Sequence, residues 1–85
     1  MNISDLAKFL SEMYDNAEEG DKTVMVHLFG VRYAEIIKQK GFTPSEIIKH
    51  TRLKNGKTIK KNQFLEINKG IKLADYVVEK KNCDK

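Results

Sequence analysis

Apolar side chains recur every three or four residues along the first part of the chain, which is the spacing of an amphipathic helix. This pattern predicts a helix from residue 3 to about residue 18, with Asn2 or Ser4 as its N-cap and Gly20 as its stop. Such a helix contributes one face to a core and presents its acids to water. Its apolar positions are Ile3, Leu6, Ala7, Leu10, Met13, Tyr14 and Ala17.

A second, longer pattern predicts a helix over residues 23–40, with Thr23 as the N-cap and Gly41 directly after the last turn. Gly30 lies within this helix and either permits close packing or marks a kink. The apolar surface is wide, so we expect the helix to be central in the fold. Val24, Leu28, Val31 and Ile36 lie close to one stripe, and Met25, Phe29 and Ile37 lie beside it.

The clearest local signal is the segment Thr43-Pro44-Ser45-Glu46. A threonine followed three residues later by glutamate forms a capping box, and proline is preferred at the first helical position. This segment therefore predicts a short helix over residues 44–51, with Ile47 and Ile48 facing inward.

The Asn55-Gly56 pair favours positive backbone φ and predicts a turn. The same pair could close a two-residue β-hairpin, which stays open as an alternative for residues 52–60. In that hairpin, Leu53 would pair with Thr58 and Ile59 with Arg52, which places the two apolar residues on opposite faces. The register therefore favours the turn.

After the turn, helical spacing returns and predicts helices over residues 58–69 and 71–79. Thr58 is a suitable N-cap for the first of them, and Gly70 either separates the two or lies within one. The tail over residues 82–85 is expected to fray. We therefore expect a single all-α domain over residues 1–85, built as a compact bundle of four or five helices.

Charge is divided unevenly along the chain, although the formal net charge is only +4. Residues 1–21 hold six acidic side chains and one lysine, whereas residues 47–65 hold six basic side chains and no acidic one. Such a division suggests that one region faces an anionic partner and that the acidic first segment faces elsewhere. A chance grouping of lysines on a solvated face is the alternative.

The pattern of reactive side chains does not indicate an enzyme, and we expect no cofactor and no metal. Cys83 lies in the polar tail without partner residues, and His27 and His50 are isolated. The glycines are scattered, so no phosphate-binding loop is present. The N-terminal residues lack the basic and apolar regions of a signal peptide, and no apolar run is long enough to span a bilayer. We therefore expect a cytoplasmic protein without a membrane partner.

The basic segment is the main functional signal. Lysine and arginine neutralise DNA phosphates, and asparagine and glutamine can read base edges if a helix holds them in the major groove. Residues 60–63 would lie in the first turn of the expected fourth helix, where recognition helices contact bases. The candidate DNA-binding residues are Lys49, Arg52, Lys54, Lys57, Thr58, Lys60, Lys61, Asn62 and Gln63.

The segment from Ser45 to Leu53, followed by Thr58-Ile59, resembles the helix-turn-helix of bacterial repressors. That pattern has a Glu-Ile pair in its first helix and starts its recognition helix near a Thr-Ile or Thr-Val pair. The chain departs from it at Ile48 and Arg52, where a small residue and a glycine are expected, and Thr58-Ile59 falls about one residue late. Residues 66–77 resemble small modules that accompany bacterial restriction-type nucleases.

These resemblances imply a helix-turn-helix-like unit and a non-catalytic DNA-binding role. The expected partner is double-stranded DNA, and the expected protein is a small bacterial or phage regulator or a defence-associated accessory protein. Many such modules form homodimers, for which the first helix offers either a dimer surface or a plain core face. The alternative is a protein–protein adaptor or inhibitor whose basic face meets an acidic partner.

Overall fold

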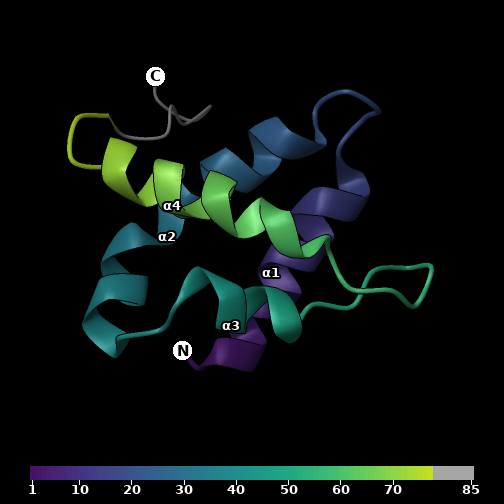
Figure 1. Cartoon of the computed structure of the whole chain (residues 1–85), viewed down its shortest axis with the longest axis horizontal. Helices are drawn as coiled ribbons and strands as arrows, with labels where there is room; N and C mark the ends of the chain where they lie inside the picture. Colours follow the sequence, from purple (N-terminus) through teal and green to yellow (C-terminus); the bar gives the residue numbers. More distant parts are fainter. Residues whose placement is uncertain (78–85) are drawn as a thin grey trace, which may run out of the picture.

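The computed structural model describes residues 1–77, and these form four α-helices and one short 3-10 helix, without strands (Figure 1). The predicted all-α architecture is confirmed. Helix α4 lies over α2, which is its most extensive packing partner, and α1 and α3 complete the bundle. The connection between α3 and the 3-10 helix projects from one side of the bundle.

Helix α1 spans Ile3–Asn16 and starts with a capping box between Asn2 and Asp5. The helix ends two residues earlier than predicted, because Ala17 adopts an extended conformation. Lys22 Nζ donates from outside the helix to the carbonyl of Tyr14, in its last turn, at 2.8 Å and to the carbonyl of the C-cap Ala17 at 3.4 Å. Leu6, Ala7 and Leu10 are fully buried, so α1 uses its apolar face in the core of its own chain.

Helix α2 spans Lys22–Lys40, and its N-cap is Asp21 rather than the predicted Thr23. It changes direction at Tyr33, whose φ of −108° and ψ of 15° are not helical. The part of its apolar surface that packs in the core consists of Val26, Phe29, Ala34 and Ile37. The stripe that contains Val24, Leu28 and Val31 faces the other way, and Val24 is 56% exposed. Since apolar residues are spread around most of this helix, its sequence did not show which side is buried.

Helix α3 spans Pro44–Lys49 and begins as predicted, with Thr43 as its N-cap. The Thr43 hydroxyl accepts the Glu46 N–H at 3.2 Å, and the Glu46 carboxylate accepts the Thr43 N–H at 3.0 Å. Ile47 and Ile48 are buried, as predicted. The helix ends before Thr51, because the Thr51 hydroxyl donates to Ile48 O and takes part in the fold of the next segment.

Residues 50–60 form an irregular connection with a turn at Asn55-Gly56 and no strand pairing. Leu53 N–H donates to Lys57 O at 2.9 Å, and Gly56 has the positive φ of 84° that the turn requires. The predicted turn is therefore correct. We name residues 52–58 the basic loop.

The two predicted helices over 58–69 and 71–79 are wrong. Residues 58–60 are extended, the 3-10 helix η1 spans Lys61–Gln63, and one continuous helix, α4, spans Phe64–Leu73. Thr58 is an exposed loop residue and caps no helix, whereas Ile59 is drawn into the core. Gly70 lies inside α4, and the chain leaves the helix at Ala74. Residues 78–79 and the tail at 82–85 lie outside the described residues.

Candidate nucleic-acid interface

The basic loop is closed at its base by a buried threonine. Thr51 is fully buried, and its hydroxyl donates to Ile48 O at 2.6 Å and accepts the Ile59 N–H at 3.1 Å. Ile59 itself is 1% exposed, so both ends of the loop are fixed in the core. One side chain thus ends α3 and joins the two chain segments that lead into and out of the loop.

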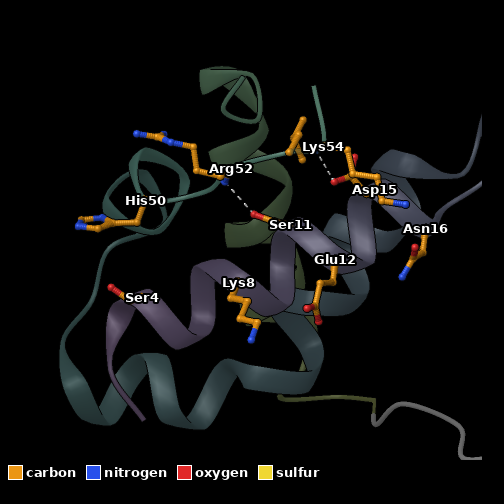
Figure 2. A pocket seen from close by; sticks show the side chains of 10 residues that line it. Ser4, Lys8, Ser11, Glu12, Asp15, Asn16, His50, Arg52 and Lys54 are labelled. Carbon is orange, nitrogen blue, oxygen red and sulfur yellow. Dashed lines mark hydrogen bonds between the residues drawn. The ribbon is translucent and has the colours of Figure 1, made fainter. Parts of the chain in front are cut away.

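The backbone at the start of the basic loop is also hydrogen-bonded to side chains of α1, as Figure 2 shows. Arg52 N–H donates to Ser11 Oγ at 3.0 Å, and Lys54 N–H donates to the Asp15 carboxylate at 2.9 Å. The side chains of His50 and Arg52 point away from α1. A groove of about 360 Å³ lies between α1 and the loop, and its walls carry both acidic and basic side chains, among them Lys8 and Glu12. This mixture of charges does not favour an anion inside the groove.

The structure brings most of the predicted DNA-binding residues onto one exposed run of chain. Lys49 ends α3, Arg52 and Lys60 directly follow the two residues that close the loop, and Lys54 and Lys57 flank its tip. No ion pair with another of residues 1–77 is formed by any of the six basic side chains of this run, which are Lys49, Arg52, Lys54, Lys57, Lys60 and Lys61. The exposed members of the predicted set are Lys49, Arg52, Lys54, Lys57, Thr58, Lys60, Lys61 and Asn62.

Gln63 is the exception among the predicted residues. It is half-buried in η1, and its Oε1 atom is enclosed without a hydrogen-bond partner among the described residues. Asn62, its neighbour, is exposed. The two amides therefore differ in what they can reach, and Asn62 is the one whose side chain is open to a partner.

Sequence reasoning missed the outer face of α4. Leu65, Asn68, Lys69 and Lys72 recur at helical spacing and are all exposed, with Leu65 50% exposed. The signal in the sequence was the recurrence of polar residues every three or four positions after Phe64. It was hidden because the helix was expected to start at Thr58 and to stop or break at Gly70. The N-terminal end of α4, which carries a partial positive charge, adjoins the lysines of η1.

The acidic side chains in α4 and directly after it contact basic side chains of the described residues. Glu66 contacts His27 Nε2 at 3.1 Å and Lys69 Nζ at 3.5 Å, and Asp75 contacts Lys38 Nζ at 3.3 Å. The Glu66 side chain is 22% exposed and lies against α2. The exposed face of α4 carries lysine and asparagine side chains, and its N-terminal end adjoins the lysine of η1.

Among residues 1–77, no group of His, Cys, Asp and Glu side chains is arranged to hold a metal ion. Among the described helices, none combines the length and apolar character needed to cross a membrane.

Comparison with known protein families matches residues 2–80 to the model of an HTH-like domain. The match covers both the bundle and the basic loop. No curated protein and no solved structure matches the chain. Helix-turn-helix domains in general bind DNA, with the second helix of the motif facing the major groove. In this chain α3 and α4 are consecutive α-helices, and residues 50–63, which include the basic loop and η1, join them.

Proposed function

The chain belongs to the family of HTH-like domains, and on this premise we propose that it binds double-stranded DNA without catalysing a reaction. We further propose that it acts as a small bacterial or phage regulator or as a defence-associated accessory protein. The observation that carries the proposal is the joining of two exposed surfaces. One is the run of exposed basic residues from Lys49 to Lys61, which form no ion pair with any of residues 1–77, and the other is the outer face of α4.

The two surfaces suit different parts of a duplex. A major groove about 12 Å wide admits one α-helix, and α4 offers Asn68, which can pair with an adenine edge, together with Lys69 and Lys72. The basic loop and η1 provide charge without a fixed pattern of hydrogen bonds, which suits phosphates. Asn62 lies where the two surfaces meet and can serve either role.

Fluorescence anisotropy of a labelled random duplex, titrated with the protein at several salt concentrations, tests the proposal. We expect log K to fall linearly with log salt concentration, because bound lysines release counterions from the DNA. The variant Lys57→Ala/Lys60→Ala/Lys61→Ala should weaken binding and reduce the slope by roughly 2 to 3. The stoichiometry of the titration separates a monomer from a homodimer that reads two half-sites.

A matched control removes the same charge elsewhere. Lys8→Ala/Lys38→Ala/Lys40→Ala lowers the net charge by the same amount at exposed positions on α1 and α2. This control should keep most of the slope if the basic loop and η1 contact the phosphates. Equal losses in both variants would mean that only overall charge matters. Absence of duplex binding even at low salt would overturn the proposal and favour an acidic protein partner.

A further inference from the structure

The bonds between α1 and the basic loop join the most acidic segment of the chain to its most basic one. Ser11 and Asp15 lie one turn apart on α1. Their side-chain oxygens accept hydrogen bonds from the backbone N–H groups of Arg52 and Lys54, which lie two residues apart in the loop. Four residues of helix rise about 6 Å. Two residues of extended chain span about 6.6 Å. The two spacings match, so α1 acts as a template for the extended part of the loop.

The two acceptors differ in their surroundings. Ser11 is 6% exposed, and its hydroxyl also donates to Ala7 O at 2.8 Å, so its oxygen is fixed in direction. Asp15 lies at the rim of the groove and uses its carboxylate on the Lys54 amide. A hydrogen bond from an amide to a carboxylate is shorter and stronger than one between neutral groups. Lys54 is thereby held at a defined place beside the loop tip.

We propose that Asp15, together with Ser11, is a positioning residue for DNA binding, since it holds the backbone of the basic loop in the conformation that meets phosphates. This inference rests on the proposed function. A loop ordered in advance loses less conformational freedom when it binds, and the gain is seen as affinity. Asp15 touches neither phosphate nor base in this arrangement and acts only through the Lys54 amide.

Because Asp15 is negatively charged, the two possible roles of this residue predict opposite changes in DNA affinity when it is replaced. A carboxylate near phosphates repels them, so its removal should strengthen DNA binding if Asp15 acts only as a charge. If Asp15 positions the loop, its removal should weaken binding. Glu12 provides the matched control, because it is exposed one turn away, lines the same groove and makes no hydrogen bond with the loop.

The experiment compares Asp15→Ala, Asp15→Asn and Glu12→Ala in the full chain, with the random duplex as probe. We expect Glu12→Ala to bind as tightly as the unmodified protein or slightly more tightly. Asp15→Ala should weaken binding about three- to tenfold in spite of the lost negative charge. Asp15→Asn retains an amide oxygen that accepts the Lys54 N–H, so it should restore the affinity. Equal affinities of Asp15→Ala and Glu12→Ala would overturn the inference.

A second measurement does not depend on DNA. Hydrogen exchange of the Lys54 amide in the free protein should be faster in Asp15→Ala and nearly unchanged in Asp15→Asn and Glu12→Ala. Unchanged protection in Asp15→Ala would also overturn the inference. If the unmodified protein fails to bind any duplex, the proposed function falls, and the exchange rates alone decide whether Asp15 orders the loop.

Discussion

Gly30 of α2 and Gly70 of α4 face each other at the closest approach of the two helices. A methyl group on Gly30 would lie 2.5 Å from the carbonyl oxygen of Ile67, and one on Gly70 would collide with the carbonyl oxygen of His27. Both obstacles are backbone atoms, so no side chain can move aside to relieve them. The absence of side chains at these two positions lets α4 lie directly on the backbone of α2.

We therefore expect Gly30→Ala and Gly70→Ala each to destabilise the protein. Alanine favours a helix over glycine by about 1 kcal/mol. Forcing two backbones apart should outweigh this gain and give a net loss of about 2–3 kcal/mol. Chemical denaturation monitored by circular dichroism measures the change in unfolding free energy. Gln39→Ala, at an exposed position of α2, is the control and should be nearly neutral. An increase in stability from either glycine variant would contradict the close contact.

Thr51 should be sensitive to the loss of its hydroxyl group rather than of its volume. Thr51→Val keeps the shape but leaves the buried Ile59 N–H without an acceptor, which should cost about 2–3 kcal/mol. Thr51→Ser keeps both hydrogen bonds and removes one methyl group, at a cost of about 1 kcal/mol. Denaturant melts of the two variants give the comparison. If valine proves no more damaging than serine, the hydroxyl does not close the loop.

The capping box at the start of α3 should stabilise the fold at neutral pH and lose this effect in acid. The N–H and then the hydroxyl of Thr43 donate to the Glu46 carboxylate, and they hold the pKa of Glu46 below its ordinary value of 4.5. Because the folded-state pKa is lowered, the stabilisation is complete above pH 4.5 and is lost as the pH falls through the lower folded value. Thermal melts should show the stability difference between the unmodified protein and Glu46→Gln shrinking below pH 4.5. A difference that stays constant there would refute the cap's charge dependence.

The outer face of α4 should divide into residues that add affinity and a residue that reads sequence. Lys72→Ala should weaken binding to all duplexes alike and reduce the salt slope by about 1. Asn68→Ala should remove about 1–3 kcal/mol of preference at one base position, because asparagine pairs with adenine through two hydrogen bonds. Selection of preferred sites from a random pool, followed by anisotropy, measures both effects. An unaltered site preference in Asn68→Ala would place base reading elsewhere, with Asn62 the next residue to test.

The features that could be predicted from the sequence are those set by neighbouring residues. The capping box at Thr43 and Glu46 and the turn at Asn55-Gly56 are written in a few consecutive side chains, and both are found as expected. The basic segment was equally visible, because charge needs no knowledge of the fold. The family match agrees with the helix-turn-helix resemblance of this region.

The remaining features depend on contacts between distant residues. Thr58 could cap a helix by its own chemistry, but Ile59 is drawn into the core beside Thr51, and this keeps the segment extended. Gly70 could end a helix, yet its contact with Gly30 favours a continuous α4 at that position. The hydrogen bonds from the loop to Ser11 and Asp15 join residues about forty positions apart, so no local pattern announces them.

The hydrogen bond between Thr51 and Ile59 divides the buried residues that the fold requires from the exposed residues of the loop. We expect the residues beyond the Ser11 and Asp15 contacts, at the tip of the loop, to be the part that can be replaced or lengthened while the buried closure stays intact. The entropy of a flexible loop changes by only about 0.6 kcal/mol for each doubling of its length. The tip of the loop can therefore vary in sequence and length, whereas the residues that close its base are fixed in the core. Proteins built on the same four helices could acquire different partners there without rebuilding their interiors.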